Sequence, residues 1–205
     1  VLLLEGIYFY NYTSPEFNVN VCQLPFWAAS IYFTWKCISY EKKVDFFFLG
    51  IVLGLGVLSK YLFIYLLLGI KFLFIYLIIN RKKINLLNYF IAGPIFLIIL
   101  SPHIFWLVEN NFSTVFYGFQ RTGGIGNYFE HLSNPLIFII KQIGILLPFI
   151  VMLYFLTKNL KFKFNFKDNK LIFLIFVVIV PLLLMLLTSI ILGAKIRTMW
   201  MTPFY

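Results

Sequence analysis

Charged residues are scarce in this chain, at 12% of its 205 residues, whereas hydrophobic residues make up 62%. A typical soluble domain has about 25% charged residues, so the composition excludes an ordinary soluble globule. The apolar residues are gathered in long runs that are typical of membrane-spanning helices. We therefore predict an all-α fold, a polytopic bundle of transmembrane helices.

Cysteine is also scarce. Cys22 and Cys37 fall in one predicted helix, fifteen residues apart, which separates them by about 22 Å along the helix axis. That distance excludes a disulfide between them. The sequence therefore predicts neither a redox framework nor a protein-held metal site.

Acidic residues number only seven against 17 Lys and Arg, which leaves a formal net charge of +10. In a soluble protein this balance would favour a nucleic-acid partner. Here the cations lie in short segments beside apolar runs, where they act as topology signals and contact anionic membrane lipids. Membrane lipids are therefore predicted as partners, and nucleic acid is not.

About 20 apolar residues are needed to span a bilayer as a helix. The chain offers about six complete runs and part of one more, within a single transmembrane domain of residues 1–205. The candidates are the tail Val1–Tyr12 and the runs Val19–Tyr40, Phe46–Leu58, Tyr61–Ile79, Leu86–Val108, Leu136–Leu156 and Leu171–Leu192.

The chain opens on VLLLEGIYFYNY, which is typical of the end of a span, and it stops at MWMTPFY, just after another. We therefore expect an internal piece of a longer protein that is inactive by itself. A soluble C-terminal part, if the protein has one, would then lie outside the chain.

Lys60 interrupts the apolar run from Phe46 to Ile79. If that run were one span, the basic clusters Lys42–Lys43 and Arg81–Lys83 would lie on opposite sides of the membrane. A reversal at Ser59–Lys60 places both on the cytoplasmic side, as the positive-inside rule requires. The third cluster, Lys158–Lys170, then also lies on that side.

The reversal leaves a short first arm. Phe46–Leu58 has thirteen residues, about 20 Å of helix against a hydrocarbon core of about 30 Å. Val44 and Asp45 at one end and Lys60 at the other would have to extend it.

The side opposite the basic clusters collects the remaining loops, including one long irregular loop. Its acids are Glu16, Glu109 and Glu130, and any polar chemistry is expected there. The segments concerned are Thr13–Asn18, Ser59–Lys60, Phe112–Pro135 and Gly193–Tyr205.

Two cations on this side have two interpretations each. Lys60 either anchors a helix end at the interface or binds a phosphate beside the small residues of GLG. Arg121 precedes a GGIG loop, which either wraps a phosphate held by the guanidinium or is a plain flexible loop. His103 and Glu109 are candidates for proton transfer, although a single histidine near a helix end is more often structural.

Four stretches follow one another along the chain: TSPEFNVNVCQLPFWA, GLGVLSKY, SPHIFWLVENNFSTVFYGFQRTG and KIRTMWMTPFY. In this ordered set the chain resembles the bacterial relatives of the dolichyl-phosphate-mannose protein mannosyltransferases. These form glycosyltransferase family 39, which includes the lipid A aminoarabinose transferases.

The resemblance implies a membrane glycosyltransferase of GT-C-like fold in the bacterial inner membrane, with its active site facing the periplasm. Such an enzyme moves a hexosyl or pentosyl group from a polyprenyl-phosphate-linked donor to a lipid, glycan or protein acceptor, with inversion. Lys60, Arg121 and, less closely, Lys195 match basic positions that bind the donor phosphate. No cofactor is firmly implied, and a divalent metal ion stays open.

The chain departs from the family in its acids. The acidic pair that supplies the general base in the family lies in the first outer loop, upstream of Val1. Glu16 and Glu109 are therefore only weak candidates for the catalytic base. Two other classes stay open: a transporter or flippase for a lipid-linked saccharide, and a membrane scaffold without catalysis.

Overall fold

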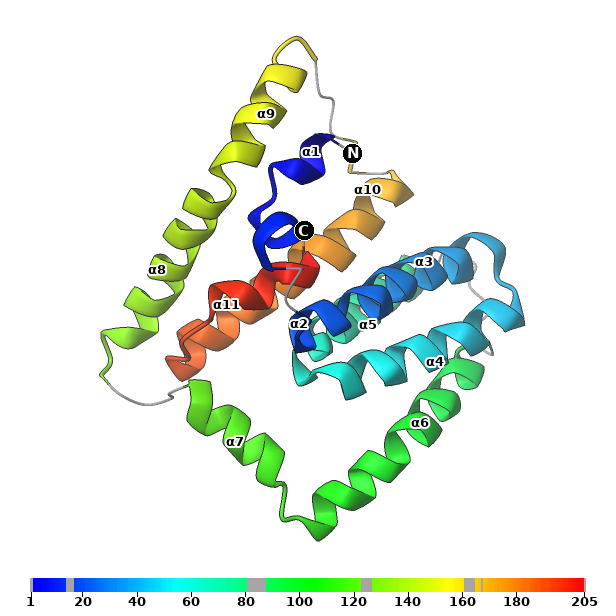
Figure 1. The fold of residues 1–205 in the computed structure, drawn as a ribbon. Coiled ribbons are helices and arrows are strands. Elements are labelled where there is room, and N and C mark those ends of the chain that lie inside the picture. The colour runs from blue at the N-terminus through cyan, green and yellow to red at the C-terminus, as the bar shows by residue number, and fades with distance from the viewer. Residues whose placement is uncertain are drawn as a thin grey trace.

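A computed structural model describes residues 2–13, 17–80, 88–122, 127–160, 165–166 and 168–204. Every regular element in these ranges is a helix, which confirms the predicted all-α fold class (Figure 1). In chain order the elements are α1 (Leu2–Glu5), η1 (Phe9–Thr13), α2 (Val19–Cys22), α3 (Leu24–Tyr40), α4 (Lys43–Ser59), η2 (Tyr61–Phe63), α5 (Ile64–Ile79), α6 (Tyr89–Glu109), α7 (Ser113–Thr122), α8 (Glu130–Ile145), α9 (Leu147–Thr157), α10 (Asn169–Leu174), η4 (Ile175–Ile179), α11 (Val180–Leu192) and η5 (Thr198–Phe204).

Three helical segments in the described ranges are long and apolar enough to cross a membrane: Tyr61–Ile79, Tyr89–Glu109 and Asn169–Leu192. The bent pair α8 and α9 raises the number to four if it crosses as one span. Helices α3 and α4 have 17 residues each, about 26 Å at 1.5 Å per residue, slightly less than the core of about 30 Å. A helical membrane protein is therefore confirmed, and the number of about six complete spans stays a prediction.

The predicted span Leu136–Leu156 is not one continuous helix. Helix α8 ends at Ile145, α9 begins at Leu147, and the two axes differ by 58°. Pro148 lies in the first turn of α9, where its missing N–H costs nothing, but its ring clashes with the carbonyl of the preceding turn. The proline therefore divides this span into two helices.

Helix α4 is longer than the thirteen residues predicted for it, because it begins at Lys43. Asp45 lies in its first turn, where a carboxylate complements the positive end of the helix dipole. The same carboxylate accepts from Lys36 Nζ of α3 at 2.8 Å, and Asp45 is buried. This ion pair neutralises the buried carboxylate between α3 and α4. Helix α4 can therefore begin at Lys43, before the predicted start at Phe46.

The predicted irregular loop Phe112–Pro135 also contains regular structure. Ser113–Thr122 forms helix α7, and α8 begins at Glu130, inside the predicted loop. Arg121 lies in the last turn of α7, where a cation stabilises the negative end of the helix dipole. The predicted glycine loop, Gly123, Gly124 and Gly126, lies outside the described residues.

The predicted reversal at Lys60 is confirmed. Helix α4 ends at Ser59, Lys60 has extended backbone angles, and η2 begins at Tyr61. The chain then returns through α5, since Asn88 just before α6 donates through Nδ2 to the carbonyl oxygen of Glu41 just after α3, at 3.0 Å. The cluster Arg81–Lys83, which lies between α5 and Asn88 in the sequence, is outside the described residues.

We define the site end as the end of the helical bundle at which Lys60, helix α7 and residues 193–199 lie (Figure 1). The ends of α3 and α5 and the beginnings of α4 and α6 lie at the opposite end. Close packing of α4 on α6 stabilises this arrangement. The two helices approach each other at glycines of α4, which have no side chain to keep them apart. A Cβ added at Gly50 would lie 2.6 Å from the carbonyl oxygen of Ala92.

Replacing Gly50 with alanine should therefore destabilise the protein. The obstacle is backbone of α6, so the two helices must separate, and we expect a loss of about 1–3 kcal/mol. Gly93→Ala on α6 is the matched control, because a Cβ there meets nothing within 4 Å. Thermal unfolding of the full-length protein in detergent should show a lower midpoint for Gly50→Ala only. Equal midpoints for the two variants would contradict the packing described.

Candidate functional site

Lys60 is held by side chains from two other parts of the chain. Its Nζ donates a short hydrogen bond to Asn20 Oδ1 of α2 and lies 5.2 Å from the ring centre of Trp200 in η5. Asn20 is buried, and its own backbone N–H donates to Asn18 Oδ1, the N-cap of α2, at 2.9 Å. The ammonium is therefore fixed by neutral partners, an amide oxygen and an aromatic face.

The charge of Lys60 is destabilised by its surroundings. Burial at the break between α4 and η2, and then the nearby charge of Arg121, lowers the pKa of Lys60 to about 8. Both causes disfavour the ammonium form, and among the described residues no carboxylate forms an ion pair with Lys60. An anion bound beside Lys60 and Arg121 would relieve both.

Helix α7 places Arg121 at this end of the bundle. Tyr61 follows Lys60 directly, and its hydroxyl forms hydrogen bonds of 2.7 Å with His103 Nε2 of α6 and with Thr114 Oγ1 of α7. Arg121 in turn donates through Nη1 to the hydroxyl of Tyr117 at 3.1 Å. His103 thus takes part in a structural link between α6 and α7, the commoner of the two roles considered for it.

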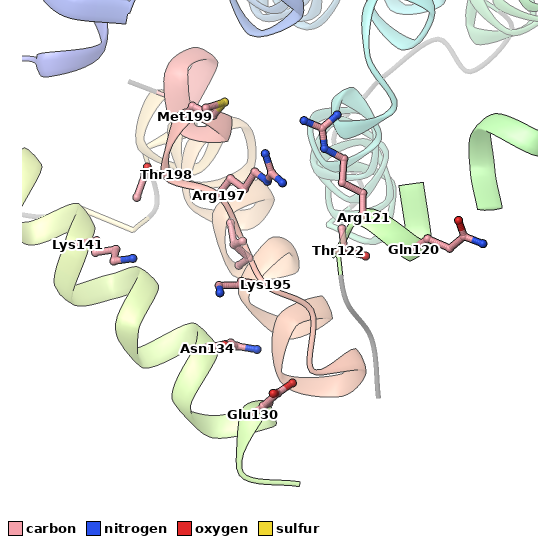
Figure 2. A pocket seen from close by; sticks show the side chains of 11 residues that line it. Gln120, Arg121, Thr122, Glu130, Asn134, Lys141, Lys195, Arg197, Thr198 and Met199 are labelled. Atoms are coloured by element: carbon pink, nitrogen blue, oxygen red, sulfur yellow. The ribbon is translucent and has the colours of Figure 1, made fainter. Parts of the chain in front are cut away.

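A cavity of about 640 Å³ opens between α7, α8 and residues 195–199. Four of its lining residues are cations and one is an acid. Figure 2 shows them approaching the cavity from three separate elements. The full lining is Gln120, Arg121, Thr122, Glu130, Asn134, Lys141, Lys195, Ile196, Arg197, Thr198 and Met199.

Hydrogen bonds to backbone carbonyl groups join the walls of this cavity. The N–H of Lys195 donates to the carbonyl oxygen of Thr122 at 2.9 Å, joining residues 193–197 to α7. Asn134 donates through Nδ2 to the carbonyl oxygen of Gly193, also at 2.9 Å, joining them to α8. Gly193 has a left-handed backbone, φ 63°, as is usual for a glycine that ends a helix. The three elements that carry the cations of the lining are thus joined to one another by hydrogen bonds.

The structure brings the three predicted phosphate-binding residues to one end of the bundle. Arg121 and Lys195 line the same cavity. Lys60 is not part of that lining, but it is close enough to Arg121 for the charge of Arg121 to lower its pKa. Whether they bind phosphate stays a prediction.

The predicted acids are less well placed. Glu109 is exposed at the end of α6 and is absent from the cavity lining, and Glu16 lies outside the described residues. Glu130, in the first turn of α8, lines the cavity instead. Within the described ranges, no group of three or more His, Cys, Asp or Glu residues could hold a metal ion.

The sequence predicted that Arg197 lies on the same side as Lys195 and that Lys141 lies near enough to a membrane interface to reach it, but it assigned neither residue to a site. Lys141 is the one charged residue in the apolar run Leu136–Leu156, and a lone cation in such a run is a signal of an internal polar site. Arg197 follows two residues after Lys195, and every residue from Lys195 to Met199 lines the cavity.

The family model of dolichyl-phosphate-mannose-protein mannosyltransferase matches residues 1–106. The chain belongs to this family. The match covers Lys60 and the helices up to most of α6, and it confirms the resemblance in the sequence. Together with the apolar helices, it supports an integral membrane glycosyltransferase. No curated protein and no solved structure matches the chain.

The Tyr61 hydroxyl is predicted to hold α7 against α6. Tyr61→Phe removes two hydrogen bonds, each contributing about 1 kcal/mol, so local opening of α7 should become several-fold more frequent. Hydrogen exchange of the amides of residues 113–122 in the full-length protein should report it. Tyr65→Phe is the matched control, because it removes a hydroxyl bond to Thr188 of α11 instead. Unchanged exchange in α7 after Tyr61→Phe would contradict the link.

Proposed function

We propose that the full-length protein transfers a hexosyl or pentosyl group from a polyprenyl-phosphate-linked donor to an acceptor at the periplasmic side of the inner membrane. Membership of the mannosyltransferase family supports transfer of a sugar by a membrane enzyme. The observation that carries the donor proposal is the convergence of Lys60, Arg121 and Lys195 at one end of the helices. In the part of the chain that the structure describes, no carboxylate forms an ion pair with them.

The proposed role of the cations follows from how the charge changes during transfer. A phosphodiester donor carries one negative charge, and its phosphate gains a second as the bond to the anomeric carbon breaks. Cations fixed beside the phosphate therefore stabilise the transition state more than the bound donor. Lys60 and Arg121 would contact this phosphate, with Lys195 completing the site from the cavity.

The remaining chemistry needs a base. The acceptor hydroxyl attacks the anomeric carbon as the phosphate leaves, with inversion, and a carboxylate takes the hydroxyl proton. The resemblance assigns this carboxylate to an acidic pair in the first outer loop, which corresponds to no position of this chain. The family's activity thus requires that segment together with the cations described here.

The membrane side proposed for the site follows from the loop positions. Lys42–Lys43 lie at the opposite end from Lys60, as do Asn80 and Asn88, which flank Arg81–Lys83 in the sequence. Basic loops stay on the cytoplasmic side, so the site end would face the periplasm. This supports a donor that is presented in the periplasmic leaflet.

Removing either cation should abolish most of the transfer. We expect Lys60→Ala and Arg121→Ala each to lower turnover of a polyprenyl-phosphate sugar by about 10²–10³-fold, the usual effect of losing a group that stabilises developing charge. Lys170→Ala is the control. Lys170 lies in the first turn of α10 and does not line the cavity, so its loss should leave turnover unchanged. Wild-type turnover in either site variant would refute the assignment. Translocation of the donor without its consumption would favour a flippase.

The lowered pKa of Lys60 predicts a pH dependence. Below about pH 8 the ammonium is present and binds the anionic donor, whereas above pH 8 the donor-free protein loses this charge. Affinity should therefore be flat up to about pH 8 and then fall by up to tenfold per pH unit. In Lys60→Arg the charge persists, so the fall should disappear. Binding of a polyprenyl phosphate, followed from pH 6.5 to 9.5, tests this, and identical profiles for the two proteins would contradict it.

A further inference from the structure

Helix α7 presents an unusual exposed surface. Val115, Phe116 and Phe119 recur at three- and four-residue spacing, so they form one stripe along the helix. Phe112 directly precedes the helix and has a left-handed backbone, φ 54°. Phe116 and Phe119 are each 60% exposed, and Phe112 is exposed as well. None of the residues of α7 is buried. An aromatic stripe in water is unfavourable unless something apolar covers it.

The other side of α7 is already occupied by the protein. Thr114 is bonded to Tyr61, and Arg121, seven residues further on and therefore on the same face of the helix, lines the cavity. These contacts fix the rotation of the helix about its axis. The aromatic stripe is therefore directed away from the cavity and cannot turn inward.

The position of α7 indicates what covers the stripe. In Figure 1, α7 crosses between the ends of α6 and α11 instead of running alongside them. The helix follows the exposed apolar end of α6, which includes Phe105 and Trp106, and it precedes Tyr128 and Phe129, which are both exposed. The stripe is thus flanked in the sequence by exposed aromatic residues, two of them at the end of a helix that is long and apolar enough to span a membrane. α7 carries no acidic residue, and its single cation, Arg121, lies at the cavity.

We propose that α7 is an interfacial helix whose stripe of Val115, Phe116 and Phe119 lies in the boundary between headgroups and acyl chains of the leaflet at the site end. Aromatic side chains are enriched at this depth, and an amphipathic helix lying in the membrane plane buries its apolar face there. Arg121, on the same helix, is then held at the level of lipid headgroups. The cavity wall formed by Gln120, Arg121 and Thr122 stands at the depth where the phosphate of any membrane lipid lies.

This proposal concerns a contact with lipid, and it holds whether or not the protein transfers a sugar. Its test therefore needs no turnover. Nitroxide labels at positions 116, 119 and 120 of the full-length protein in phospholipid vesicles, with Cys22 and Cys37 replaced, report collisions with dissolved oxygen and with a water-soluble nickel complex. A label at position 97, exposed in the middle of α6, gives the reference for lipid.

We expect oxygen collisions to exceed nickel collisions at positions 116 and 119, as at position 97, and the reverse at position 120, which lines the cavity. Nickel access at 116 and 119 equal to that at 120 would place the stripe in water and overturn the proposal. Protection from both reagents would show that protein covers the stripe, which also overturns it.

A second measurement avoids substitutions in α7. In the full-length protein of natural sequence, phospholipids carrying a photoreactive group near the headgroup should label the peptide 112–122 as efficiently as the end of α6. Labelling of α6 without labelling of α7 would refute the proposal independently of the nitroxide variants.

Discussion

The structure depends on one constraint, the placement of the Lys60 ammonium at the end of a long apolar run. A charge in the middle of a bilayer core is unfavourable by several kcal/mol, so the helix breaks beside it and the chain reverses. The reversal brings the ammonium to Asn20 and Trp200, residues that are distant in sequence. It also sends α5 back toward the start of α4. The site end and the opposite end of the bundle both follow from this single break.

The two ends treat their charges differently. At the opposite end, Lys36 is paired with the buried carboxylate of Asp45. At the site end, Lys60 is bonded to an amide oxygen and Arg121 to a tyrosine hydroxyl. The charge of a paired ion is neutralised by its partner. A cation that is bonded only to a neutral group keeps its net charge and still attracts an anion. Among the described residues, the cations of the site end thus retain the charge that the proposed donor phosphate would use, and α7 would hold one wall of the site at the membrane surface.

The positions of charges along the sequence were enough to predict the helical fold, the reversal at Ser59–Lys60 and the gathering of Arg121 and Lys195 at one end. These features depend on where cations fall between apolar runs, and such patterns are local. The break at Leu146 could also have been predicted, because Pro148 stands inside the apolar run. The extension of α4 through Val44 and Asp45 was also predicted, but the ion pair of Asp45 with Lys36 of another helix was not, because it forms only in the folded chain.

The cavity was beyond sequence analysis for the same reason. Lys141 and Arg197 belong to elements that meet only in the folded chain, and Glu130 joins them through the position of α8. Helix α7 was assigned to an irregular loop because ten residues with few strong helix formers give a weak local signal. Its regular spacing of aromatic residues becomes meaningful only once the contacts of its polar side are known.

The central claim is that Lys60 and Arg121 bind one phosphate. The most direct measurement is a structure of the full-length protein with a bound polyprenyl monophosphate in a lipid bilayer mimic. The account predicts a phosphate within hydrogen-bond distance of both Lys60 Nζ and the Arg121 guanidinium. A phosphate bound elsewhere, with Lys60 still bonded only to Asn20, would contradict it.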